Sequence, residues 1–151
     1  MERARERVNI PMNEAKLPGK RITIILSSSE YQRVSNALSI ALAALSVGLE
    51  AYILLTFDSL NRFRKGHLND MGEETPQRLQ PAIQSGICGG PIQPLDEQLA
   101  VAREMGLKIY ACPNAMATFK IARRELVEVD EVMGLISFMG IVDGAAANWY
   151  I

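Results

Sequence analysis

The chain has 151 residues and a mass of 16.7 kDa, the size of one ordinary domain with a single core. Apolar residues make up 48% and charged residues 22%, and 16 basic against 17 acidic side chains leave a net charge of -1. This balance excludes a disordered chain and a strongly basic nucleic-acid binder. One His and two Cys are too few for a Cys/His zinc site or a disulfide-dense secreted scaffold.

Neither a membrane span nor a secretory signal is expected. A span needs roughly 20 mostly apolar residues, and serine and asparagine interrupt the most apolar stretch, residues 34–49. The first ten residues are charged and lack the apolar stretch of a signal peptide. We therefore expect a cytoplasmic protein with reduced thiols, and we expect no metal and no cofactor.

Residues 1–19 are expected to form a flexible tail, and residues 20–151 a single α/β domain. Arg and Glu dominate the first seven positions, and Pro11, Pro18 and Gly19 break any regular element.

Residues 22–26 (ITIIL) predict a strand buried on both faces, as in a parallel sheet. Ser27, Ser28 and Ser29 follow it, at the start of the next predicted helix. Serine often caps helices, and the N-terminus of a helix attracts anions, so these three residues are candidate anion ligands.

Residues 31–48 predict a helix that carries no charge between Arg33 and Glu50. A helix packed on one side normally presents charged residues on the other. We interpret the uncharged face as a contact with another subunit; the alternative is tight packing within the chain.

Residues 51–57 (AYILLTF) predict a second buried strand, which completes a βαβ unit with a right-handed crossover. Residues 58–94 are rich in glycine and proline and read as an irregular insertion. Short helices are expected within it, at residues 59–65 and 76–83.

The remaining elements alternate in the same way. We expect helices at residues 95–105 and 116–124, strands at 108–111 and 131–136, a turn or helix at 138–147, and a short edge strand at 148–151. The pattern predicts a three-layer, flavodoxin-like sandwich with a mostly parallel sheet of four or five strands.

Cys112 is the strongest candidate for chemistry. It directly follows a predicted strand, where ligands bind in open parallel sheets, and Pro113 after it favours the first position of a helix. Cys112 would then be the N-cap, and its sulfur would face the backbone amides of the first turn, including those of Asn114 and Ala115. These amides and the helix dipole favour the thiolate, which is the nucleophilic form. The alternative is a packed, inert thiol.

Other cysteine chemistries fit the sequence less well. Phosphatase-type loops place Arg six positions after the cysteine, where this chain has Thr118, and no C-x-x-C pair is present. His67 is the only imidazole and reads as a solvated loop residue. Cys88 is a candidate second thiol that would relay sulfur or act in a redox pair with Cys112; a bystander thiol is the alternative. No Walker A or G-x-G-x-x-G motif supports a nucleotide site.

Residues 108–119 (KIYACPNAMATF), with the ITIILSSSE start, the AYILLTFDSL segment and the late DEVMGLISF segment, resemble the DsrE/DsrF-like family of sulfur-relay proteins. The nearest branch reads Ala-Cys-x-x-Ser-Met, then two residues and Met-Gly. Cys112 and Met116 match this pattern, whereas Ala115 replaces the serine and Phe119-Lys120 replace the Met-Gly.

The resemblance implies a flavodoxin-like fold, a homo-oligomer (a trimer or hexamer), and a persulfide carried on Cys112 with a sulfur-carrier protein as partner. The first hypothesis is therefore a cytoplasmic sulfur-transfer protein. The second is a non-catalytic oligomeric subunit that binds a small ligand or a partner, with Cys112 merely packed.

Overall fold

A computed structural model describes residues 19–151 of the chain. Residues 1–18, where most of the predicted tail falls, lie outside the described residues.

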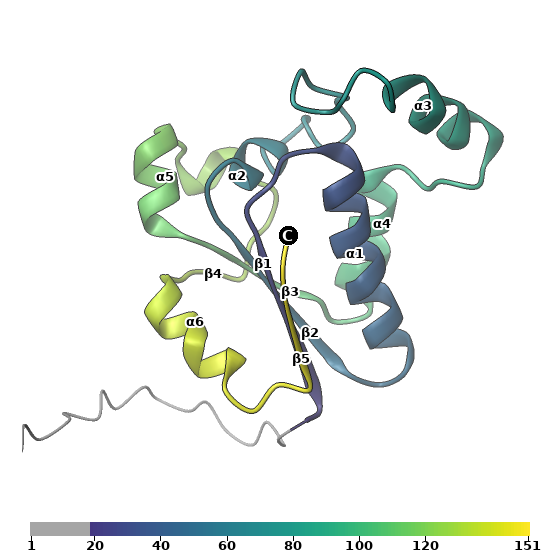
Figure 1. Cartoon of the computed structure of the whole chain (residues 1–151). Helices are drawn as coiled ribbons and strands as arrows, with labels where there is room; N and C mark the ends of the chain where they lie inside the picture. The colour runs from purple at the N-terminus through teal and green to yellow at the C-terminus, as the bar shows by residue number, and fades with distance from the viewer. Residues whose placement is uncertain (1–18) are drawn as a thin grey trace, which may run out of the picture.

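Five parallel strands form one sheet in the order β4-β3-β2-β1-β5 (Figure 1). They are β1 (Arg21–Leu26), β2 (Glu50–Leu55), β3 (Lys108–Ala111), β4 (Glu131–Val132) and β5 (Ala147–Tyr150). The chain runs outward from β1 to β4 and then returns, so that β5 pairs with the free side of β1, with Ile24 opposite Trp149. The predicted three-layer α/β fold is confirmed, and the sheet is parallel throughout.

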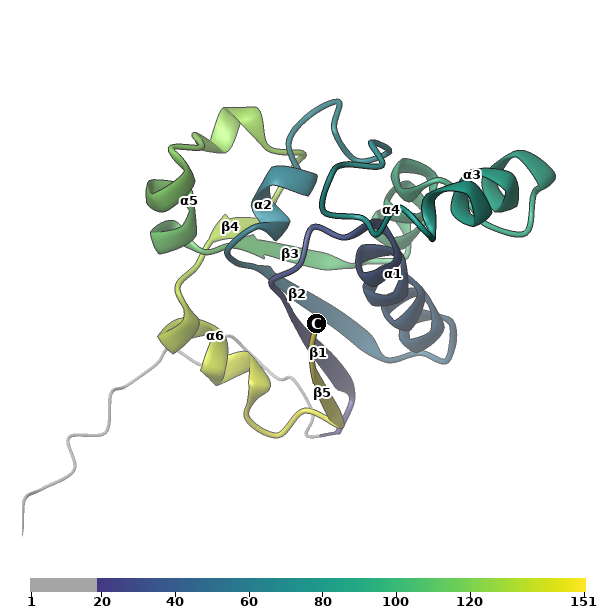
Figure 2. The ribbon, with the colours of Figure 1, turned by 45° about the horizontal axis from the view of Figure 1, so that its top comes forward.

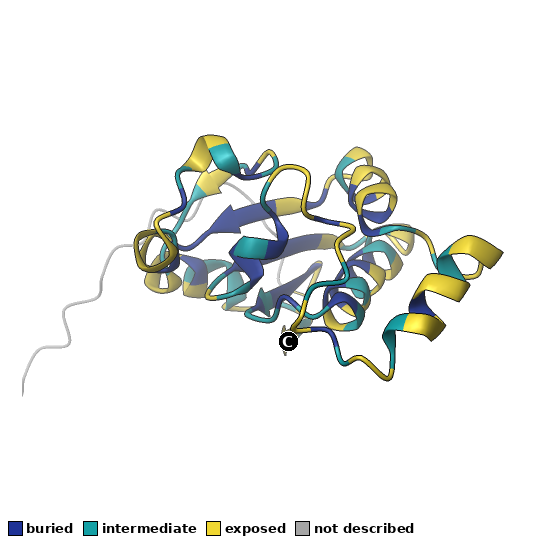
Figure 3. Cartoon of the chain, turned by 90° about the horizontal axis from the view of Figure 1, so that it is seen from above, coloured by how far each residue is buried: buried dark blue, intermediate teal, exposed yellow. Residues whose placement is uncertain are grey.

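Helices cover both faces of the sheet. On one face α1 (Tyr31–Ser46) packs against β1, β2 and α4 (Leu95–Glu104); on the other face lies α6 (Leu135–Val142), which contacts β1 and β2 (Figure 1). The central strands are therefore buried on both sides, as Figure 3 shows in dark blue. This burial explains why β1 and β2 are apolar runs rather than alternating ones.

Helix α1, which carries no charge after Arg33, has its apolar stripe against the sheet, as its periodicity predicts. Val34, Ala37, Leu38 and Ala41 are fully buried. The helix ends at Ser46, and Gly48 adopts a positive φ of 83° just before β2, a conformation that costs glycine little. The uncharged residues on the opposite face of α1 are exposed to solvent in the single chain.

The predictions were less accurate within the insertion and after β3. The insertion at residues 58–94 contains α2 (Ser59–Arg62) and α3 (Gln80–Gly89), the second later than predicted. The helix predicted at 116–124 is instead α5 (Pro113–Phe119), which ends because Lys120 adopts a left-handed backbone (φ 53°); a short 3₁₀ turn (Arg123–Glu125) follows.

The predicted strand at 131–136 was too long, because only the two residues of β4 pair with β3. Gly134 then caps α6, which takes up the apolar residues that were assigned to the strand. A short apolar run without strict alternation does not distinguish a strand from a buried helix.

Asp130, between the 3₁₀ turn and β4, ties α4 to β3. Its carboxylate accepts hydrogen bonds from the Ile109 amide (2.7 Å) and from the Arg103 guanidinium, and Lys108 lies 3.6 Å away. Partial burial acts to raise the pKa of Asp130, but these hydrogen bonds and the two cations outweigh it, so the pKa lies below the ordinary value.

Replacing Asp130 with Asn is expected to cost about 1–2 kcal/mol at pH 7, because a charged acceptor is lost. A depressed carboxyl pKa stabilises the fold above the ordinary carboxyl pKa, and this contribution disappears as the pH falls through the folded-state value. Urea unfolding at pH 7 and pH 3 should therefore show the difference between the two proteins shrinking in acid. Glu104→Gln, at an exposed position of α4, is the control; an equal loss at both pH values for Asp130→Asn would contradict the prediction.

Candidate functional site

The candidate site lies at the carboxyl ends of β1, β2 and β3, where parallel sheets bind ligands. Three loops meet there: residues 27–30 after β1, residues 56–58 after β2, and Cys112 after β3. Helices α2 and α5 rise from this edge of the sheet and contact each other (Figure 2).

Cys112 is the N-cap of α5 and Pro113 is its first residue, as the sequence predicts. The Cys112 amide donates to the Leu55 carbonyl (2.9 Å), which extends the pairing of β3 with β2 by one residue. Its own carbonyl accepts from the Met116 amide (3.0 Å) in the first turn of α5. Strand and helix together hold the Cys112 backbone in place.

The Cys112 side chain is less exposed to solvent than the position of the residue at the N-cap of α5 suggests. The residue is only 7% exposed. Its sulfur makes no capping hydrogen bond with α5, so the amides of Asn114 and Ala115 do not donate to it as expected. Ala115 is itself buried, whereas Asn114 is exposed and its carbonyl accepts from the Thr118 hydroxyl (2.8 Å).

The three serines after β1 all have partners within the chain. Ser27 donates to the Ile151 carbonyl (3.1 Å), and Ser28 accepts from the Glu30 amide (3.1 Å). Ser29 is buried and donates to the Asp58 carboxylate (2.6 Å). An anion at this position would face that carboxylate, so these contacts do not favour the predicted anion site.

The start of α1 is also covered by another segment. The Tyr31 amide donates to the Thr75 hydroxyl (3.1 Å), and both residues are buried. Thr75 belongs to the irregular insertion, which thus caps the helix that follows β1.

Two residues of α2 are structural in ways that sequence reasoning missed. Ser59 is fully buried; its single hydroxyl proton is shared between the carbonyls of Leu26 (2.7 Å) and Thr56 (2.8 Å), and the residue so joins the ends of β1 and β2. Arg62 is 2% exposed and lies beneath the loop of residues 67–74. A serine and an arginine in a polar segment read as surface residues, so no local signal identifies either.

Arg62 organises the insertion. Its guanidinium donates to the Ser29 carbonyl (2.9 Å), to the Glu74 carboxylate (3.1 Å), and to several backbone carbonyls of residues 67–71. Burial lowers the pKa of Arg62, and the Glu74 and Asp70 carboxylates act in the opposite direction. The loop is thus wrapped around a buried cation that also contacts the serine loop.

A polar pocket of about 230 Å³ opens beside Arg62. His67 lines it and lies 2.8 Å from the Asp70 carboxylate, with both side chains more than half exposed. The histidine is thus a solvated loop residue, as predicted.

Cys88 is exposed on α3 and lines a second pocket, of about 280 Å³, with Met71 and Ile87 among its neighbours. In Figures 1 and 2, α3 and α5 lie on opposite sides of the carboxyl edge of the sheet. The fold therefore does not bring Cys88 to Cys112.

Among residues 19–151, His, Cys, Asp and Glu side chains do not gather in threes as a metal site would require. In the same range no helix has the length and apolar character to cross a membrane.

Comparison with known proteins identifies relatives. The model of the DsrE/DsrF-like family matches residues 20–147. The uncharacterized protein YrkE of Bacillus subtilis is 24% identical over 155 residues, covering 87% of this chain and 97% of that protein. The crystal structure of the ychN protein from E. coli matches with a TM-score of 0.62 at 14% identity, over 87% of this chain and 99% of that one. The last likeness concerns the fold alone.

Proposed function

Because the chain belongs to the DsrE/DsrF-like family, whose function is of the sulfur-relay type, we propose that it is a sulfur-transfer protein with Cys112 as the persulfide-carrying residue. The observation that carries the proposal is the position of Cys112 at the N-cap of α5, directly after β3. It is the thiol that the described structure places at the carboxyl edge of the sheet.

The proposed reaction needs a nucleophilic sulfur and no imidazole. The Cys112 thiolate attacks the outer sulfur of a donor persulfide, R–S–SH. The donor S–S bond breaks, the donor leaves as a thiol, and the outer sulfur remains on Cys112. An acceptor thiolate on a partner carrier protein then attacks this sulfur and releases Cys112 as thiolate, so neither transfer has a net oxidation or reduction.

Two observations support the alternative function. Cys112 is buried, and its sulfur makes no capping hydrogen bond. Ala115 supplies no hydroxyl at the position where the nearest family pattern has a serine. Both suit a non-catalytic oligomeric subunit in which Cys112 is packed. A redox pair of Cys88 and Cys112 is less well supported, since α3 and α5 are far apart.

Intact-mass measurement of the two single-cysteine variants separates these functions. After incubation with inorganic polysulfide and removal of excess reagent, Cys88→Ser is expected to gain about 32 Da per sulfur atom, and Cys112→Ser to gain much less. Iodoacetamide should block the gain in Cys88→Ser. If a folded, reduced Cys88→Ser protein gains no sulfur and reacts slowly with iodoacetamide, the sulfur-transfer proposal fails and the packed-thiol function stands.

The proposal also includes the protein's location and its assembly. We place the protein in the cytoplasm, where thiols stay reduced, and expect it to act as a homo-oligomer, a trimer or hexamer as the resemblance implies. Neither expectation depends on the reactivity of Cys112.

A further inference from the structure

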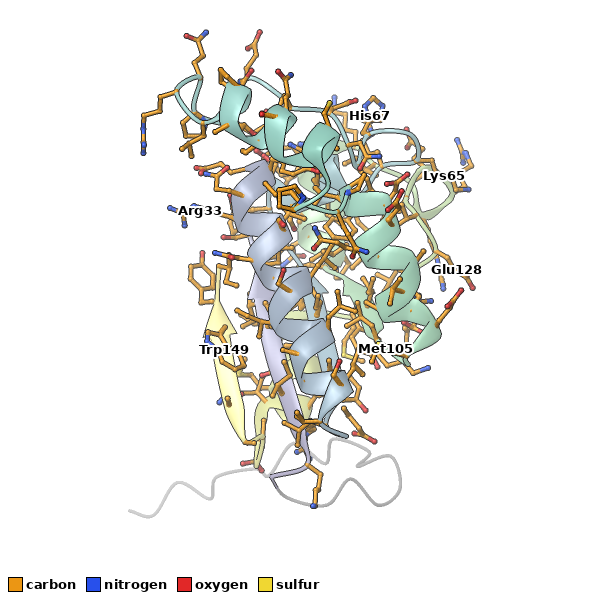
Figure 4. All side chains as sticks on the ribbon, turned by 90° about the vertical axis from the view of Figure 1, so that its right-hand side faces the viewer. Arg33, Lys65, His67, Met105, Glu128 and Trp149 are labelled. Atoms are coloured by element: carbon orange, nitrogen blue, oxygen red, sulfur yellow. The ribbon has the colours of Figure 1, made fainter. Side chains whose placement is uncertain are left out.

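Helix α6 is apolar on every side, yet its outer side is open in the described structure. Its eight residues (Leu135–Val142) include no charged side chain, and Phe138 alone among them is buried. A helix that is apolar all round is normally covered on all sides. On the opposite face of the sheet α1 and α4 lie side by side (Figure 4), whereas within residues 19–151 no helix packs against α6 in this way.

The outer side of α6 carries an apolar ridge along the helix axis. Leu135, Met139 and Val142 follow one another at i, i+4 and i+7, the spacing of residues on one side of a helix. Leu135 is 50% exposed, Met139 is 40% exposed, and Val142 is half-buried. Ile136 lies to one side of this α6 ridge, about 90° further around the helix.

The described chain begins beside one end of the α6 ridge. The Gly19 amide donates to the Gly144 carbonyl (2.8 Å), two residues after the end of α6. The Arg21 guanidinium donates to the Ile141 carbonyl in the last turn of α6 (2.7 Å). Figure 1 shows the start of β1 beside the loop that follows α6. Residues 1–18 are therefore joined to the domain at the C-terminal end of α6.

Residues 8–12 (VNIPM) have a pattern that matches the α6 ridge. Val8, Ile10 and Met12 are apolar and alternate with a polar residue and a proline. Alternate residues of an extended chain share a face, and proline disfavours a helix and favours an extended residue before it. The three side chains would span about 13 Å of an extended chain, and the α6 ridge spans about 11 Å.

We propose that residues 8–12 dock as an extended segment on the α6 ridge of the same chain, with Met12 nearest Val142 and Val8 nearest Leu135. This inference does not rest on the sulfur chemistry of Cys112. The segment fits because its apolar face covers an uncharged helix, and neither side would bury a charge.

The connection to the domain is long enough for this contact. Seven residue steps separate Met12 from Gly19, and they extend to about 23 Å, whereas α6 is about 12 Å long. A short linker also holds the segment near the ridge at an effective concentration of about a millimolar. A small apolar contact that would be too weak between separate molecules is therefore sufficient within one chain.

Hydroxyl-radical footprinting of the full chain tests the docking with a matched pair of variants. Ile10→Asp places a charge in the proposed contact, whereas Asn9→Asp adds the same charge on the opposite side of the extended segment. Labelling of Met139 is expected to rise about twofold in Ile10→Asp, because a chain lying across a partly exposed side chain covers about half of its open surface. Asn9→Asp should match the wild type. Equal labelling in the wild type and a folded Ile10→Asp protein, as judged by circular dichroism, overturns the proposal.

Oxidation of paired cysteines distinguishes docking within one chain from docking between copies. In a protein that carries Cys88→Ser and Cys112→Ser, Val8→Cys is combined with Leu135→Cys or, as the control, with Ile136→Cys. The pair at Leu135 is expected to form a disulfide faster than the pair at Ile136, and the product should migrate as a single chain in a denaturing gel. Equal rates for the two pairs, or a disulfide that joins two chains, overturns the proposal.

Discussion

Replacing Arg62 with Met is expected to lower the free energy of unfolding by about 3–5 kcal/mol. The substitution removes a buried cation and leaves its hydrogen-bond acceptors without a donor. The Arg62 guanidinium serves the Ser29 carbonyl, the Glu74 carboxylate and the carbonyls of residues 67–71. Methionine fills a similar volume but donates no hydrogen bond, so these acceptors lose their partner while remaining largely shielded from water. The guanidinium also lies 5.8 Å from the ring centre of Tyr31, a cation–π contact that is lost with it.

Urea unfolding of the wild type and Arg62→Met measures this loss. Arg64→Met is the matched control, since Arg64 is two residues further on and its ion pair with Glu125 (3.2 Å) is well exposed on both sides. Exposed ion pairs contribute little, so the control midpoint should hardly move. Faster hydrogen exchange of residues 66–75 in Arg62→Met would locate the effect in the insertion. An unfolding free energy within 1 kcal/mol of the wild type would show that Arg62 does not organise the loop.

Replacing Phe138 with Ala is expected to cost about 3–5 kcal/mol, because a fully buried aromatic ring is removed from a small helix. Phe138 is the buried residue of α6, and it meets the Tyr110 ring edge-on with 6.1 Å between the ring centres. Tyr110 in turn stacks on Tyr52 at 6.3 Å. Loss of the ring leaves a cavity between α6 and the sheet. It also removes the one side chain of α6 that is fully buried.

Thermal and urea unfolding check this prediction. Ile136→Ala is the control, because the same helix exposes 75% of Ile136 and substitution there should change stability by less than about 0.5 kcal/mol. Equal losses for Phe138→Ala and Ile136→Ala would mean that α6 is not anchored by burial, or that a partner covers its outer face.

Local sequence patterns predicted the helices and strands reliably where interactions between residues close along the chain decide the structure. β1, α1, β2, α4 and β3 lie within about two residues of their predicted bounds, because continuous β-branched runs and a clear helical stripe follow from backbone geometry and burial alone. The capping role of Cys112 was equally local: the proline after it fixes the φ angle of the first helical residue.

The partners of polar residues were decided only by the tertiary structure. Ser29 meets Asp58, Tyr31 meets Thr75, and Arg62 is buried under a loop that follows it. In each case the two groups come from different loops, and a serine or an arginine in a polar segment reads the same whether it is solvated or buried. The predicted anion ligands at Ser27–Ser29 and the predicted sulfur–amide contacts at Cys112 depended on such orientations, and side-chain orientation is not set by sequence spacing.

The amino-acid sequence by itself determined the layered α/β class, the βαβ start, the family and the placement of Cys112 at the end of a strand. These follow from periodicity, from proline and glycine, and from residues close along the chain. Only the tertiary structure decided that β5 returns to β1 and leaves an open edge, and that Leu135 and Ile136 belong to helix α6 rather than to the preceding strand. Contacts across more than a hundred residues set both outcomes, because pairing and burial depend on which surfaces remain free once the central strands have assembled.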